Sequence, residues 1–248
     1  MLSYVIDIKQ HQKDFPGEEI CGYLIEKSNG ELIYVRCNNI AEDKKNSFEI
    51  SIEDSQCARE IGNVKALVHS HPSKKHGSHM SPWDRISQLN YRDDWIILNN
   101  RGSLKTFPPL TPFKGRKYEH NINDCATIVR DFFDFNGIKF HIPDHSERWW
   151  HEGKNLYIDG YENAGFEKIS KTSDIQYGDV FLINYASPVP NHALIYVGNN
   201  KILHHQMDNI SKVERLDRFH LRFTHSIYRH KLISPEWCEK ICNIIRGE

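Results

Sequence analysis

Residues 67–72 read LVHSHP and place His69 and His71 at the end of an apolar run that begins at Val64. The run has the β-branched content of a strand, and positions i and i+2 of a strand face the same side. Two imidazoles on one face at this spacing can hold a zinc ion. An isolated pair of this kind also occurs at polar strand ends without a metal, so the rest of the chain decides between the two interpretations.

A carboxylate and a hydroxyl follow the two histidines. A helix is expected over residues 81–90, because the segment opens with Ser-Pro, and Asp84 in its first turn offers a third ligand. Three protein ligands leave a fourth position for water, as in catalytic zinc sites. Glu19 is the candidate base for that water and Glu18 is its competitor, while Ser81 is the candidate donor to a tetrahedral oxyanion.

Three short motifs in this half resemble those of JAMM, or MPN-type, zinc metallopeptidases: ExCG at Glu19–Gly22, HxHP at His69–Pro72 and SxxD at Ser81–Asp84. The resemblance implies zinc (Zn) on His69, His71 and Asp84. It further implies that Glu19 acts as acid and base, that Ser81 lies in the oxyanion hole, and that a peptide or isopeptide bond is hydrolysed. The loop histidines His76 and His79 fall outside the motifs and are expected to be solvated.

A second candidate site surrounds Cys125, which opens a helix expected over Cys125–Phe135. The positive end of a helix dipole favours thiolate, the form that attacks carbonyl carbon. A later strand opens with His192, and the next strand delivers His204. If those strands are antiparallel neighbours, His192 contacts Cys125 while His204 orients the imidazole from behind. His205, on the opposite face of a regular strand, is the alternative third member.

The stretches DCATIVRDFF, YGDVFLI and HALIYVG, with a second histidine twelve residues after the first, resemble NlpC-type cysteine peptidases over most of residues 116–248. The resemblance implies a reduced papain-like core and cleavage of stem peptides in bacterial peptidoglycan. The implied roles are Cys125 as nucleophile, His192 as base and His204 as orienter.

Some positions in this half depart from that pattern or remain open. Tyr118 stands where an aromatic residue often lines the site, but Asn121 replaces a frequent glycine and Ala126 a serine, which bears on substrate fit. Two pairs are assigned to packing: Cys238 with Cys242, for which metal binding is the alternative, and Trp149 with Trp150, for which a cleft wall is the alternative.

The 248-residue chain is long enough for two domains, and the fold class expected is α+β. Residues 107–115, FPPLTPFKG, resist helix and central strand, so 109–115 is the expected linker. Residues 1–108 would form a JAMM-like α/β/α sheet domain and 116–248 the NlpC-type domain. Strands are expected at 21–26, 32–39, 64–68, 95–99, 179–185, 191–198 and 201–207, and helices at 1–14, 50–62, 81–90, 125–135 and 235–248.

Composition excludes several classes of protein. A formal net charge of -1 gives no general reason to expect nucleic acid, and no apolar run approaches the roughly 20 residues of a membrane helix. The N-terminal stretch lacks the layout of a secretory signal, so synthesis in a cytoplasm is expected. The six cysteines are scattered along the chain and are interpreted as thiols.

A JAMM-type domain followed directly by an NlpC-type domain resembles the K-type tail tip assembly proteins of long-tailed bacteriophages. The resemblance implies a peptidase made in the host cytoplasm and then carried at the virion tail tip. Its partners would be other tail tip or hub proteins, and it would act at the bacterial cell wall. The alternative is a structural or assembly component with one or both sites inactive or occluded. A cellular isopeptidase would explain only residues 1–108.

Overall fold

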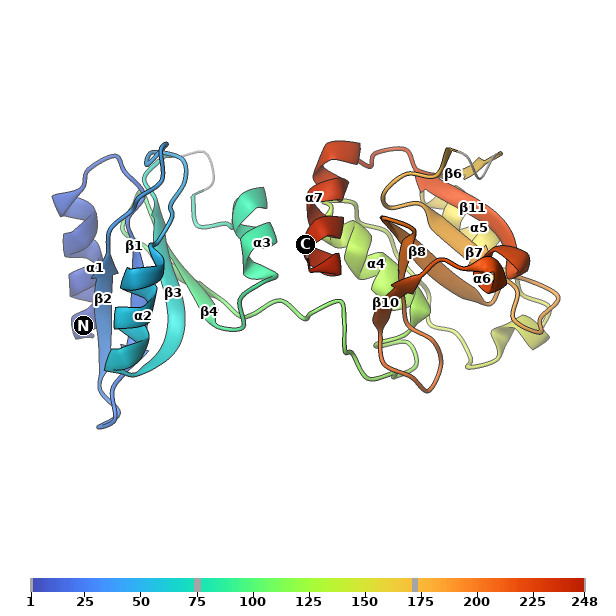
Figure 1. Cartoon of the computed structure of the whole chain (residues 1–248), viewed down its shortest axis with the longest axis horizontal. Coiled ribbons are helices and arrows are strands. Elements are labelled where there is room, and N and C mark those ends of the chain that lie inside the picture. Colours follow the sequence, from blue (N-terminus) through green and yellow to red (C-terminus); the bar gives the residue numbers. More distant parts are fainter. Residues whose placement is uncertain (1, 74–76, 171–173, 248) are drawn as a thin grey trace. The chain divides into compact units, whose positions relative to one another are not determined.

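The computed structural model describes residues 2–73, 77–170 and 174–247. The chain divides into two compact units, Met1–Thr111 and Pro112–Glu248 (Figure 1). The division falls inside the proline-rich segment. Within the described residues, no helix has the length and apolar character needed to cross a membrane.

The first unit has one mixed sheet. Its elements in chain order are α1 (Ser3–Asp14), β1 (Cys21–Glu26), β2 (Leu32–Cys37), α2 (Ile52–Ile61), β3 (Asn63–His71), α3 (Pro82–Gln88), β4 (Asp94–Asn99) and β5 (Leu104–Phe107). The strand order is β2-β1-β3-β4-β5, in which β3 and β4 run parallel and the other neighbours antiparallel. Together with the second unit described below, this confirms the predicted α+β class.

Each face of this sheet carries its own core. Leu24 of β1 packs in a cluster with Ile8 of α1, whereas Tyr23 and Ile25 pack in a cluster with Ala58 of α2. Successive strand residues point to opposite faces, so the alternation in β1 serves both cores. Helices α1 and α2 therefore cover opposite faces of the sheet (Figure 1).

Strand register brings the predicted metal ligands to the start of β1. Cys21 is the partner of His69 in the antiparallel pair of β1 and β3. Glu19 precedes β1 by two residues and therefore lies near the end of β3. The peptide at this junction is fixed, since Ile20 donates its N–H to the Ser70 hydroxyl at 3.0 Å and Ser70 donates its N–H to the Ile20 carbonyl at 3.1 Å.

Gly22 is required where β1 passes Tyr34. A Cβ atom there would lie within contact distance of the Val35 carbonyl oxygen and 2.8 Å from the Tyr34 hydroxyl. We expect Gly22→Ala to destabilise the chain by about 1–3 kcal/mol, because overpacked sites shift side chain and backbone. Calorimetry should show a lower unfolding temperature for this variant than for the parent chain. Gly160→Ala is the control, since a Cβ there meets nothing within 4 Å. Equal unfolding temperatures of the two variants would contradict the steric explanation.

The second unit has an antiparallel sheet. Its elements are α4 (Cys125–Phe135), η1 (Trp149–His151), α5 (Leu156–Asn163), β6 (Phe166–Ile169), β7 (Val180–Ile183), β8 (His192–Gly198), β9 (Lys201–His204), β10 (Lys212–Arg215), α6 (Arg218–Phe223), β11 (Thr224–His230) and α7 (Pro235–Arg246). The strand order is β10-β9-β8-β7-β11-β6, and every neighbouring pair is antiparallel.

Helix α4 is the amphipathic element that carries Cys125. Its residues Phe132 and Phe133 are fully buried, and the helix contacts β8. Phe113, from the end of the proline-rich segment, packs edge-on against Phe132 and Phe135. The last residues of the predicted linker therefore belong to the core of the second unit.

Candidate functional sites

In the first unit, His69, His71 and Asp84 come together. Nε2 of His69 lies 3.2 Å from Nε2 of His71. The Asp84 carboxylate oxygens lie 3.3 Å from Nε2 of His69 and 3.1 Å from Nε2 of His71. All three side chains are buried. Three donor atoms therefore face a common point inside the protein.

The donor set fits zinc. With metal–nitrogen bonds of about 2.05 Å, two tetrahedral ligand atoms are roughly 3.3 Å apart, close to the separations observed. Nδ1 of His71 lies 3.1 Å from the Gly77 carbonyl oxygen and donates to it, which leaves the Nε2 lone pair for a metal.

Electrostatics in this cluster favour an ionised Asp84. Burial raises the pKa of Asp84, but hydrogen bonds from His69 and His71 outweigh burial and hold it well below its usual range. Burial lowers the pKa of His69. At His71 burial is outweighed by the polar neighbours of the imidazole, with the hydrogen bond to Asp84 first among them, and the pKa is raised. An ionised carboxylate is the form in which Asp84 can bind a metal.

Of the two candidate bases, Glu19 is the one placed at the cluster. It is buried, and burial raises its pKa to about 8 against the opposing effect of His71, with Asp84 raising it further. Glu18 is only half-buried, and its carbonyl accepts a hydrogen bond from Gln12 at 3.1 Å.

Ser81 and Asp84 form a capping box at the start of α3. Asp84 donates its N–H to the Ser81 hydroxyl at 3.1 Å, and the Ser81 N–H donates to Oδ2 of Asp84 at 2.6 Å. Ser81 therefore holds the carboxylate in place. Phe48, which the sequence did not single out, stacks on His69 with ring centroids 4.6 Å apart. His79 is exposed as expected, while His76 lies outside the described residues.

In the second unit, Cys125 begins α4 and Asp124 caps that helix. The Asp124 carboxylate accepts the N–H groups of Ala126 at 3.0 Å and Thr127 at 2.8 Å. The Cys125 sulfur lies 3.0 Å from the Tyr157 hydroxyl. Burial, followed by the negative charge of Asp124, raises the pKa of Cys125 to about 12. The helix dipole was expected to favour a thiolate, but burial and the neighbouring carboxylate outweigh the dipole in the resting site.

His192 and His204 form a hydrogen-bonded pair, since β8 and β9 are antiparallel neighbours. Nε2 of His192 lies 3.1 Å from Nδ1 of His204. Burial, and then the neighbouring His204, lower the pKa of His192 well below its usual value, so this imidazole is neutral. Because Nε2 of His192 faces His204, Nδ1 is the nitrogen left to exchange a proton with Cys125.

A carboxylate lies next to His204 and extends the series of interacting side chains that begins at His192. Nε2 of His204 lies 2.9 Å from Oε1 of Glu214 on β10, although the angle falls outside that of a good hydrogen bond. Lys212 contacts the other oxygen of Glu214 at 2.6 Å, and Nε2 of His220 lies 3.3 Å from Oε1. The short distance and the buried imidazole indicate that Glu214 orients His204. The sequence analysis missed this residue.

Cys125 and His192 line one cavity. Its wall also includes Tyr118, Trp149 and Trp150, so the aromatic residue predicted at Tyr118 and the cleft-wall alternative for the tryptophans are both observed. Trp149 is also buried, which agrees with the packing interpretation.

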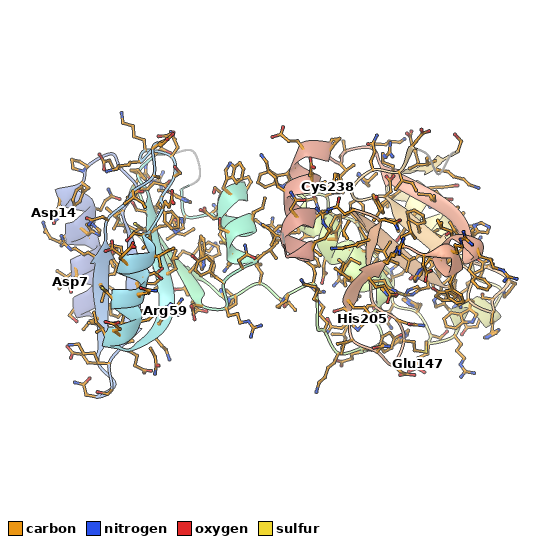
Figure 2. All side chains as sticks on the ribbon, viewed as in Figure 1. Asp7, Asp14, Arg59, Glu147, His205 and Cys238 are labelled. Carbon is orange, nitrogen blue, oxygen red and sulfur yellow. The ribbon has the colours of Figure 1, made fainter. Side chains whose placement is uncertain are left out.

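His205, labelled in Figure 2, does not reach His192. It lies 3.2 Å from the Asn209 carbonyl oxygen, and its ring meets that of Tyr118 edge-on. His204 is therefore the residue that the fold pairs with His192. Asn121 has φ 61°, so it adopts the left-handed backbone that glycine favours and that asparagine tolerates.

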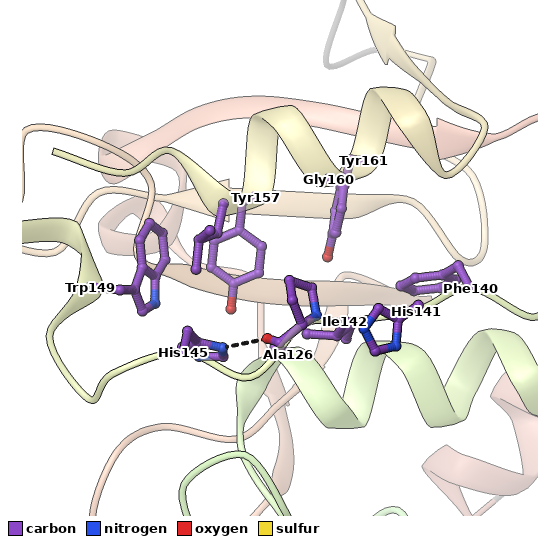
Figure 3. A pocket seen from close by; sticks show the side chains of 11 residues that line it. Ala126, Phe140, His141, Ile142, His145, Trp149, Tyr157, Gly160 and Tyr161 are labelled. Atoms are coloured by element: carbon purple, nitrogen blue, oxygen red, sulfur yellow. Dashed lines mark hydrogen bonds between the residues drawn. The ribbon is translucent and has the colours of Figure 1, made fainter. Parts of the chain in front are cut away.

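A second, more apolar pocket adjoins the cavity. Figure 3 shows that Trp149, Tyr157 and Tyr161 contribute side chains to it, with Ala126 on its floor. His145, Trp149 and Tyr157 line both spaces. An apolar substrate side chain can therefore sit beside the thiol. Away from both spaces, Cys238 and Cys242 are buried with sulfur atoms 3.9 Å apart, in accord with packing.

We expect Glu214→Ala to lower kcat about tenfold, which corresponds to ~1.4 kcal/mol, because His204 then loses its charged partner. Glu214→Gln keeps an oxygen acceptor and should recover part of that loss, with KM nearly unchanged in both variants. Steady-state kinetics of peptide hydrolysis over a range of pH provide the measurement. If the alanine variant keeps the parent's kcat and pH profile, Glu214 does not orient His204.

Three comparisons with known proteins bear on these sites. Residues 113–233 match the NlpC/P60 family. The chain is 37% identical over 186 residues to tail tip assembly protein K of Escherichia phage lambda, covering 73% of this chain and 89% of that protein. It is 28% identical over 229 residues to tail tip assembly protein K of Escherichia phage N15, covering 90% of this chain and 92% of that protein. Among solved structures, NlpC2 from Trichomonas vaginalis is similar with a TM-score of 0.38 and 16% identity, over 86% of this chain and 70% of that chain.

Proposed function

We propose that the second unit of this chain is a cysteine endopeptidase acting on the stem peptides of peptidoglycan. The chain belongs to the family of phage tail tip assembly proteins K and carries an NlpC/P60 domain. The observation that carries the proposal is the cavity lined by Cys125 and by His192, whose imidazole is hydrogen-bonded to His204. A thiol, a neutral base and an orienting imidazole are the groups that acyl transfer requires.

The proposed reaction starts from the protonated thiol. His192 takes the proton of Cys125 on Nδ1 while the sulfur attacks the peptide carbonyl carbon, and His204 with Glu214 stabilises the imidazolium that forms. The imidazolium then gives its proton to the leaving amine, and an acyl-enzyme remains on sulfur. Water, deprotonated by His192, hydrolyses the thioester and restores the thiol.

Digestion of purified peptidoglycan by the purified chain tests this proposal. We expect mass spectrometry to find fragments with new peptide amino and carboxyl ends and no new reducing sugar ends. Alkylation with iodoacetamide should stop their release. Fragments that carry only new sugar ends, or release that survives complete alkylation of Cys125, would contradict a cysteine endopeptidase.

The first unit is proposed to be a JAMM-like zinc metallopeptidase that hydrolyses a peptide or isopeptide bond. His69, His71 and Asp84 would hold the ion, which supplies Lewis-acid polarisation and lowers the pKa of a bound water. Glu19 would take the proton of the attacking water and return it to the leaving amine, and the Ser81 hydroxyl would donate to the tetrahedral oxyanion. The Ser81 N–H holds the Asp84 carboxylate. The convergence of three buried donor atoms within 4.8 Å of one another supports this proposal.

The proposed setting is the tail tip of a virion. The chain would be made in the host cytoplasm, assemble with other tail tip or hub proteins and reach the cell wall with the particle. Mass spectrometry of purified virions should detect the chain, and fresh virions should digest peptidoglycan. Virions that contain the chain but digest nothing, together with an inert purified chain, would instead indicate a structural component.

A further inference from the structure

A second cluster of metal-ligating side chains lies in the wall of the Cys125 cavity. His120, Asp124 and His145 each offer a donor atom within 4.8 Å of those of the other two. Asp124 is buried, and the two histidines are half-buried. The catalytic scheme above uses neither histidine.

Both imidazoles are already oriented as metal ligands usually are. Nε2 of His120 lies 2.6 Å from the His145 carbonyl oxygen. Nδ1 of His145 lies 3.1 Å from the Pro143 carbonyl oxygen, an interaction drawn as a dashed line in Figure 3. A nitrogen facing a carbonyl oxygen carries the proton, so each ring keeps a lone pair on its other nitrogen. Donation of the second N–H to a backbone carbonyl is the typical outer support of a metal-bound histidine.

Hydrogen bonds tie the two loops that carry these residues together. Nδ2 of Asn121 donates to the His145 carbonyl oxygen at 3.0 Å, and the Asn121 N–H donates to Oδ2 of Asp124 at 2.8 Å. The Asp124 carboxylate accepts three N–H groups in all. A carboxylate has about four lone-pair positions, so one remains for an ion.

Cys125 follows Asp124 directly and lines the same cavity as all three residues. We propose that His120, Asp124 and His145 bind a divalent transition-metal ion such as Zn²⁺, and that an ion bound in this wall of the cavity hinders access to Cys125 and so silences the cysteine. Two imidazoles and a carboxylate are a ligand set that suits tetrahedral zinc with solvent in the fourth position.

Cobalt titration of the full-length chain tests the site without reference to peptidase activity. In a His69→Ala/His71→Ala background, which removes the other histidine cluster, we expect about one Co²⁺ per chain with tetrahedral visible absorption. His120→Ala and His145→Ala should each weaken binding at least tenfold. His141→Ala is the matched control, because His141 is exposed, lies in the same loop as His145 and is outside the cluster. Absence of tetrahedral Co²⁺ in the background, or equal binding by all variants, would overturn the site.

The silencing effect rests on the proposed peptidase function, so it is measured in two ways. Zn²⁺ should slow the alkylation of Cys125, followed by peptide mass mapping, in the background chain but not in its His120→Ala/His145→Ala derivative. Zn²⁺ should also inhibit stem-peptide release by the first and not by the second. Equal alkylation and equal inhibition in both would overturn the silencing. A chain that releases no peptides, yet shows metal-dependent protection of Cys125, would reject the peptidase and keep the metal site.

Discussion

The Cys125→Ala variant should release stem peptides from peptidoglycan at least about 10³-fold more slowly than the parent chain. The sulfur forms the bond to the substrate carbonyl, and no other thiol lies among the described residues that line the cavity. His192 and His204 cannot compensate, because their role is to move a proton and not to form the acyl-enzyme. The rate of peptide release, measured by mass spectrometry at matched protein concentration, provides the test.

Cys57→Ala is the matched control for this prediction, because Cys57 is an exposed thiol in the first unit. It should keep the parent's rate. Circular dichroism should show that both variants are folded. If Cys125→Ala releases peptides as fast as Cys57→Ala, the cysteine mechanism is wrong, whatever the activity of the parent.

The second large effect is expected in the first unit. Purified without added metal, the chain should contain about one zinc per molecule, and His69→Ala/His71→Ala should contain almost none. The double variant removes two of the three buried donors and leaves Asp84 as an isolated carboxylate, which binds zinc weakly. Elemental analysis after exhaustive dialysis measures the difference. Both chains carry His120→Ala/His145→Ala in this measurement, so that the second histidine cluster contributes no ion.

His79→Ala is the control for metal content, because this exposed histidine lies in the same connecting loop. It should retain the parent's zinc. Equal zinc in the double variant and the parent would reject the assignment of His69 and His71. The double variant should also unfold at a lower temperature, since an ion that binds only the native state stabilises it.

The sequence predicted elements best where pattern and capping agreed. The helix over Cys125–Phe135 has the predicted bounds, because Asp124 is a strong cap and the apolar residues recur at helical spacing. The residues of both site patterns also come together. His69 and His71 share a face by strand geometry, and the pairing of β8 with β9 brings His192 to His204.

The remaining features depend on contacts between distant parts of the chain. The short strands β6 and β10 were not predicted, since each has at least two charged residues among its four, unlike the apolar β7 of the same length. Glu214 and Tyr157 reach the second site only because of where β10 and α5 pack. No spacing rule links either residue to Cys125. The raised pKa of Cys125 was missed for the same reason, as burial cannot be inferred from a cap.

The capping box at α3 links the formation of this helix to the proposed metal site, because both depend on Asp84. One carboxylate, that of Asp84, closes the first turn of a seven-residue helix and faces two imidazoles. So short a helix has little stability of its own in water. A substitution that removes the Asp84 carboxylate therefore weakens the cap and removes a proposed metal ligand at once, so selection cannot relax one role of this residue while keeping the other.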